Sequence, residues 1–230
     1  MKKVLLSLAM LTVISTPVLA KSPVANLKIN GDIKPPTCTI NGATQNDVIF
    51  DYGAISPTLI PQSKNYLYPS TAVQNTVTIE CDAKTYLTFV ASDTYDSAEL
   101  ANNTSAQFHL VDKANTENAI GAALFIWNNV TVDDKPAYIS RANDVAITGE
   151  IFNNVLYKGP TNGWTSEKQS GVNKNSLALI SGNIFQATFK QGTKSRTFIL
   201  SKDSLSKKGI DLSNGLDFMG EAVLTFNFGV

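Results

Sequence analysis

The chain has 230 residues with 19 basic and 19 acidic side chains, so its formal net charge at neutral pH is zero. This balance provides no field that would steer the protein toward nucleic acid or an anionic membrane, and we expect neither as a partner. The length and a hydrophobic content of 43% suit one domain with a sizeable core, because all-β folds commonly reach this size without dividing.

The N-terminus predicts a secretory signal peptide. Lys2 and Lys3 precede the apolar run VLLSLAMLTVIS, and the small residues of VLA at 18–20 are typical of a signal peptidase site. A transmembrane anchor is the alternative, but the run is shorter than the roughly 20 apolar residues that cross a bilayer, and no later run reaches that length. Cleavage would remove residues 1–20 and leave an exported mature chain, 21–230, with no membrane span.

The two cysteines of the chain, Cys38 and Cys81, both remain after this cleavage. In an exported protein an even pair predicts a disulfide, whereas the same pair in a cytosolic protein would more often bind metal or stay reduced. A cross-link over this separation would remove denatured-chain entropy on the order of 4 kcal/mol. Two free buried thiols are the alternative.

The dominant periodicity of the mature chain is two, which is typical of β-strands. Apolar and polar residues alternate from Leu27 to Ile33 and again around Val77 and Ile79. Further β-rich runs are VIFDYG, YLTFVAS, ALFIW, DVAITGEIF, NIFQATF, RTFIL and EAVLTFNF. Turn-forming clusters separate these runs, and only DSAELANN and SKDSLSKK could form a helical turn or two. Many short strands with regular turn signals predict an all-β sandwich.

Residues 149–182 are rich in Asn, Gly and Ser, which predicts a mobile loop or hairpin rather than a domain linker. Of the two tryptophans, Trp127 lies in the apolar run ALFIW and is expected in the core. Trp164 lies in the Gly- and Asn-rich stretch and is the better candidate for contact with a sugar ligand.

Residue patterns for catalysis are mostly missing from the sequence. His109 is the one histidine, and its alternating run QFHLVD predicts a partly exposed sheet residue rather than a general base. Zinc-binding, phosphate-binding and nucleophile-elbow motifs are absent, so we expect a protein without catalytic residues, metal or cofactor. The pair Asp133-Asp134, with Asp93 and Asp96, offers carboxylates for glycoside hydrolysis or calcium, but turn carboxylates are commonly solvated without such a role.

Three segments resemble parts of the subunits of chaperone-usher fimbriae, the pilins. Residues 27–40 (LKINGDIKPPTCTI) resemble the opening strand, residues 76–89 (TVTIECDAKTYLTF) the strand with the second cysteine, and residues 218–230 (FMGEAVLTFNFGV) the C-terminal strand. With DYGAIS and FQATF, the pattern is closer still to a larger, poorly characterised pilin-like family encoded beside fimbrial chaperone and usher genes. The resemblance covers both ends and about half of the chain.

This resemblance implies an immunoglobulin-like, pilin-type β-sandwich that lacks its final strand, as a single domain over residues 21–230. In the family, a periplasmic fimbrial chaperone lends a strand, and the arm of a neighbouring pilin subunit later replaces it at the outer-membrane usher. The chain is then a structural or minor fimbrial subunit that contributes to surface adhesion, with a host glycan as a candidate ligand. The alternative is a secreted or periplasmic carbohydrate-binding module whose sandwich is complete in itself.

The resemblance also implies two elements of strand exchange. Residues 21–30 would be a short donor arm, with Ala25, Leu27 and Ile29 entering a neighbour's groove. The alternative is that these residues form the chain's own first strand.

The second element is the C-terminal strand, as the edge for the chaperone and for strand exchange. One face of this strand carries Ala222, Leu224, Phe226, Phe228 and Val230. An ordinary core strand would show the same alternation. The terminal aromatic of the family is usually the penultimate residue, whereas Phe228 is followed here by two more residues.

Overall fold

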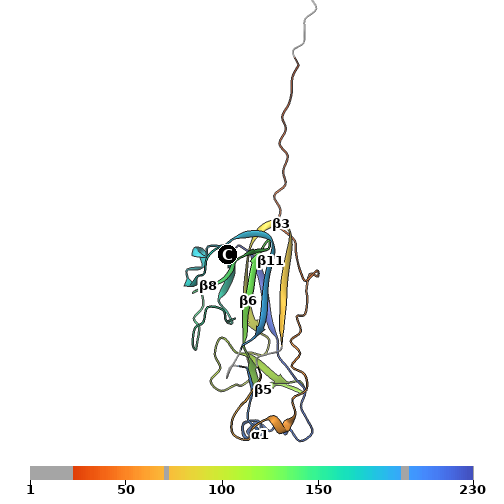
Figure 1. The fold of residues 1–230 in the computed structure, drawn as a ribbon, viewed down its shortest axis with the longest axis vertical. Helices are drawn as coiled ribbons and strands as arrows, with labels where there is room; N and C mark the ends of the chain where they lie inside the picture. The colour runs from red at the N-terminus through yellow and green to blue at the C-terminus, as the bar shows by residue number, and fades with distance from the viewer. Residues whose placement is uncertain (1–22, 70–72, 193–196, 230) are drawn as a thin grey trace, which may run out of the picture. The chain divides into compact units, whose positions relative to one another are not determined.

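The fold is described by a computed structural model over residues 23–69, 73–192 and 197–229 (Figure 1). The predicted signal peptide lies outside these residues. The chain divides into two units, 1–34 and 35–230.

In the first unit, residues 23–34 form neither helix nor strand. The side chains of Leu27 and Ile29 are 98% and 100% exposed. The predicted strand over this alternating stretch is therefore wrong for the chain by itself. Pro35 and Pro36 follow directly, and proline has no backbone N–H to donate to a strand ladder.

Residues 35–230 contain two largely antiparallel β-sheets, which agrees with the predicted all-β class. The first sheet has the order β10-β8-β9-β3-β11-β6-β7, and β1 and β14 also pair with β3. Its strands are β1 (Cys38–Ile40), β3 (Gln74–Asp93), β6 (Phe125–Val132), β7 (Lys135–Pro136), β8 (Tyr138–Ala142), β9 (Thr161–Thr165), β10 (Ser170–Val172), β11 (Ser181–Gln191) and β14 (Ala222–Phe228).

The second sheet has the order β13-β4-β5-β12-β2. Its strands are β2 (Tyr66–Leu67), β4 (Phe108–Asp112), β5 (Asn115–Ala123), β12 (Phe198–Ile199) and β13 (Phe218–Met219). Three short helices complete the elements: η1 (Pro57–Leu59), η2 (Lys174–Ser176) and α1 (Lys202–Lys207). In the part of the chain that the structure describes, no helix is long and apolar enough to span a bilayer.

The 20-residue strand β3 connects most of the first sheet. Its first part, 74–86, pairs with β11 and, at 79–81, also with β1. Its last part, 87–93, pairs with β14 and, at 88–90, also with β9. Cys38 lies directly opposite Cys81 in the β1–β3 ladder, and the two form a disulfide. The predicted disulfide is confirmed, and it ties a strand of only three residue pairs to the sheet.

Two main apolar clusters fill the unit. The first, the principal core, is built on buried side chains of β3, β6, β9 and β11, among them Phe89, Phe185 and Trp127. The predicted core position of Trp127 is confirmed, since 5% of this residue is exposed. The second core contains Ile120 of β5, Ile199 of β12 and the fully buried Leu205 of α1.

The predicted elements are present in part. Strands form in the runs near residues 88, 125, 186 and 198 and at the C-terminus, and SKDSLSKK contains α1, which starts after the N-cap Ser201. DSAELANN forms turns instead of a helix. The runs VIFDYG and DVAITGEIF form no strand. In the second of these, Gly149 has a φ of +91°, outside the β region.

Residues 149–182 contain two strands that the sequence analysis missed, β9 and β10. The prediction of a loop is wrong for β9, because this strand pairs with both β3 and β8 and is buried along its whole length. Its two threonine side chains are hydrogen-bonded: Thr161 donates from Oγ1 to Asp144 at 2.6 Å, and Thr165 donates to the Glu167 carbonyl at 2.7 Å. A polar composition therefore does not prevent burial here.

Candidate strand-acceptor groove

The C-terminal strand β14 has one free backbone edge. It forms seven antiparallel residue pairs with β3, from Ala222 opposite Asp93 to Phe228 opposite Leu87. Among the described residues, no other strand pairs with β14. Its outer N–H and C=O groups are therefore available to a further strand. Such a free sheet edge can pair with another chain, either in aggregation or in specific assembly.

The hydrogen-bond pattern shows which residues face this edge. The Gly229 N–H donates to the Tyr86 carbonyl at 2.9 Å, and the Thr94 N–H donates to the Glu221 carbonyl at 3.1 Å. Because hydrogen-bonded positions alternate along an antiparallel ladder, the odd-numbered residues of β14 direct their backbone groups toward β3. Ala222, Leu224 and Phe226 therefore direct theirs toward the free edge.

The even-numbered side chains of β14 form one face of the strand. Ala222, Leu224 and Phe226 pack against the principal core, where the Phe226 ring lies 5.8 Å from that of Phe89. Phe228, at the end of the strand, is 48% exposed. Val230, the last residue of the predicted face, lies outside the described residues.

The end of β14 is held against the sheet. Thr88, which is buried, donates from Oγ1 to the Gly229 carbonyl at 2.5 Å. Gly229 has a φ of +74°, a left-handed conformation that favours glycine and ends the strand. Gly229 thus turns the chain out of the strand direction.

Residues 44–55 form the opposite side of the groove and are called the wall segment here. The segment belongs to no strand, yet its side chains alternate: Val48 and Phe50 pack against the principal core, whereas Ile49 is 69% exposed. The Phe50 ring lies 5.1 Å from that of Phe125. Among the described residues, none pairs with the wall segment in a β-ladder. The backbone on this side therefore belongs to no ladder, although side chains donate to the Ile49 and Tyr52 carbonyls.

Tyr52 anchors the wall segment to the second core. Its ring stacks on Tyr68 at 4.4 Å, and the Tyr68 hydroxyl donates to the Tyr52 carbonyl at 2.7 Å. Burial, and then the neighbouring Tyr68, raise the pKa of Tyr52 above its usual range, so this phenol stays neutral.

A groove of about 1560 Å³ lies between β14 and the wall segment. Its floor is apolar and includes Ile79, Leu87, Phe108, Ile120 and Phe125. An extended apolar groove beside a free strand edge can accept a strand that places alternate side chains in the groove and extends the ladder. Leaving such backbone groups unpaired is costly once water is excluded.

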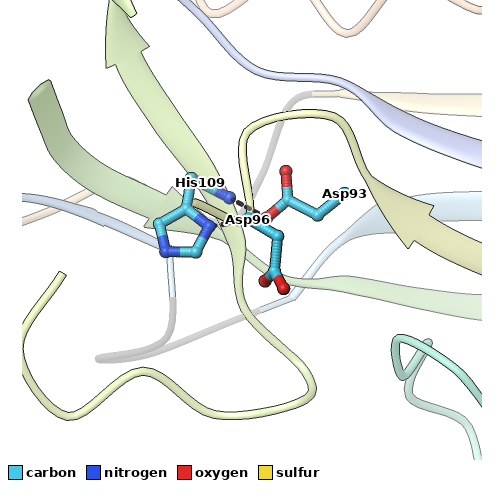
Figure 2. A group of neighbouring side chains, drawn as sticks. All are labelled: Asp93, Asp96 and His109. Carbon is cyan, nitrogen blue, oxygen red and sulfur yellow. Dashed lines mark hydrogen bonds and ion pairs between the residues drawn. The ribbon is translucent and has the colours of Figure 1, made fainter. Parts of the chain in front are cut away.

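A separate polar cluster joins the two sheets close to the start of β14 (Figure 2). The buried Asp93 carboxylate, at the end of β3, is 2.6 Å from His109 Nδ1 and accepts the His109 backbone N–H at 2.8 Å. Burial by itself would raise the pKa of Asp93, but the hydrogen bonds from His109 and Tyr95 hold it below the usual range.

The prediction of a partly exposed His109 is wrong, because the residue is completely buried. The ligand atoms of Asp93, Asp96 and His109 lie within 4.8 Å of one another, a grouping that could hold a metal ion. However, the Lys158 ammonium bonds Asp96 and lies 3.7 Å from Asp93 Oδ2, so a cation of the chain itself already pairs with both carboxylates.

The other predicted carboxylates do not join this cluster. Asp133 and Asp134 lie in the turn between β6 and β7, both with positive φ. Asp133 Oδ1 accepts the backbone N–H groups of Asn183 and Ile184, each at 2.9 Å, and these bonds lower the pKa of Asp133. Its role is to close a turn.

Trp164 is not available as a sugar-stacking residue. It is 1% exposed, and its ring lies in the principal core 5.6 Å from Phe185 and 5.4 Å from Phe89. The indole Nε1 donates to the Gln186 carbonyl at 3.3 Å. The predicted ligand contact is therefore corrected to a core position on β9.

We expect acid to weaken the fold partly through Asp93. Since its folded pKa lies below the ordinary value of 3.8, its contribution is fully present above that value and is lost as the pH falls through the folded pKa. Urea unfolding between pH 6 and pH 2.5 should show a shallower acid loss in Asp93→Asn than in the native chain. Equal slopes would contradict the prediction. Some acid dependence should remain, because Asp133 and Asp144 also have lowered pKa values.

Comparison with models of protein families finds no match to this chain, and comparison with curated proteins finds no similar sequence. The groove and the free edge of β14 therefore carry the functional proposal.

Proposed function

We propose that the chain is a structural or minor subunit of a chaperone-usher fimbria, assembled by donor-strand exchange and contributing to surface adhesion. The observation that carries the proposal is the free edge of β14 beside an apolar groove whose other side belongs to no β-ladder. The fold would then be a pilin-type, immunoglobulin-like sandwich without its final strand. The protein would be exported and would pass through the periplasm to the cell surface.

Three kinds of partner follow from this proposal. A periplasmic chaperone covers the groove first, the outer-membrane usher receives the complex, and the arm of a neighbouring subunit replaces the chaperone strand. The exposed apolar side chains of residues 23–34 support the donor role, since Leu27 and Ile29 find no cover within the chain's own described residues. A complete, free-standing sugar-binding module is less well supported, because Trp164 is buried.

The free edge can be blocked without disturbing the β3 ladder. Ala222→Pro removes an N–H that faces the edge, and proline is tolerated on an edge strand when that side is unpaired. We expect this variant to lose co-purification with a fimbrial chaperone in the periplasm, because its ring obstructs the added strand. Ala222→Val is the matched control, since it keeps the N–H on the same inward-facing position.

The native mature chain expressed without the chaperone should be degraded or aggregate, and coexpression should restore soluble protein. Accumulation of a stable native monomer without the chaperone would overturn the proposal. So would an Ala222→Pro variant that binds the chaperone as well as Ala222→Val does.

A further inference from the structure

The groove has an acidic rim. Its lining includes four exposed carboxylates and one lysine, namely Asp47, Asp51, Asp217, Glu221 and Lys113. Two of the carboxylates come from the wall segment, and the other two flank the short strand that leads into β14. The acidic charge therefore lies on both sides of the apolar floor.

These rim carboxylates are not neutralised by ion pairs within the part of the chain that the structure describes. The ion pairs there join His109 and Lys158 to Asp93 and Asp96 only. Glu221 accepts a hydrogen bond from the Thr94 hydroxyl, and Asp51 accepts one from the Gly53 N–H. Both bonds come from neutral donors and leave the negative charge in place. The chain as a whole has no net charge, so this excess is local.

The arm of the chain has the complementary pattern. In an extended strand, successive side chains point to opposite faces, so Leu27 and Ile29 would enter the groove while Lys28 stays at its rim. Lys28 is the one charged residue among residues 23–31. Residues 23–34 would span about 40 Å when extended, against about 23 Å for the seven residues of β14, so the arm is long enough.

We propose, building on the strand-exchange function above, that the acidic rim selects donor strands with a basic residue on the solvent side. The arm of a second copy of this chain is such a strand, with Lys28 as the residue that determines specificity. Burial of Leu27 and Ile29 provides the affinity. The charge of Lys28 discriminates among arms of similar hydrophobicity, because complementary charges favour correct encounter and oppose like-charged partners.

The test uses the full mature chain in complex with its fimbrial chaperone, which keeps it soluble, and fluorescent peptides of residues 23–34. Replacement of the chaperone strand by the peptide is measured by anisotropy at low and high salt. At low salt we expect Lys28→Gln to weaken peptide binding about threefold and Lys28→Glu about tenfold. At high salt the differences should shrink, because exposed charges are screened. A Leu27→Asp peptide is the control for the apolar contact and should not bind.

The matching change on the acceptor is the double variant Asp47→Asn with Asp51→Asn, both at exposed positions. We expect it to narrow the difference in affinity between the native and Lys28→Glu peptides, with a remainder from Asp217 and Glu221, which keep their charge. Equal binding of these peptides to the native chain at low salt would overturn charge selection and leave strand exchange intact. Tighter binding of the Lys28→Glu peptide would point to a foreign donor strand instead. If the native peptide does not bind at all, both the selection and the strand-exchange function are wrong.

Discussion

Trp164→Ala should lower the free energy of unfolding by about 3–5 kcal/mol, the usual cost of removing a fully buried large aromatic ring. The indole is 1% exposed and packs between rings of three strands, with Phe226 of β14 at 6.4 Å in addition to Phe89 and Phe185. The variant also leaves the Gln186 carbonyl without the indole N–H. Chemical denaturation followed by circular dichroism measures the loss.

Two controls separate burial from aromatic character in this experiment. Trp164→Phe keeps a ring and should lose clearly less stability than the alanine variant. Tyr138→Ala removes an aromatic side chain that is 47% exposed on the neighbouring strand β8, and its effect should stay within about 0.5 kcal/mol. A Trp164→Ala protein as stable as the Tyr138→Ala protein would show that the ring is not in the core.

Cys38→Ser should destabilise the chain by about 4 kcal/mol, because the disulfide closes a loop with a sequence separation of 43. That is a large part of the 5–15 kcal/mol of stability typical of a natural domain. We therefore expect the yield of folded protein from the periplasm to fall strongly. Thermal unfolding of purified protein is the second measurement.

The double variant Cys38→Ser with Cys81→Ser controls for an unpaired reactive thiol and should be destabilised to a similar extent. Added reductant should lower the melting temperature of the native chain and leave that of the double variant unchanged. A native melting temperature that does not respond to cleavage of the bond would contradict the prediction. Since β1 has only three residue pairs with β3, the wall segment that follows it should loosen when the bond is lost.

The sequence alone was sufficient for the class of fold and for the elements with strong local signals. Period-two alternation in EAVLTFNF placed Ala222, Leu224 and Phe226 on one face, and these side chains do pack toward the core. The predicted export and the even number of cysteines together predicted the Cys38–Cys81 bond, which the structure contains. These inferences depend on neighbouring residues or on the chemistry of one residue type.

The tertiary structure decided which alternating segments form strands. LKINGDI and VIFDYG alternate as clearly as β14 does, yet neither belongs to a ladder. A strand needs a partner backbone, and the sequence of one segment does not show whether a partner lies beside it. The reverse holds for β9, whose Asn- and Gly-containing sequence resembles a loop but is enclosed by β3 and β8.

The polar residues show the same limit. The alternating run predicted a half-exposed His109, but the fold brings Asp93, 16 positions away in the chain, beside it. The hydrogen bond between them offsets part of the free-energy cost of burying the imidazole. Lys158, which completes that cluster, has no local signal in the sequence. Burial and long-range pairing depend on the whole chain, so only the folded arrangement turns Trp164 into a core residue and Asp47, Asp51, Asp217 and Glu221 into one acidic rim.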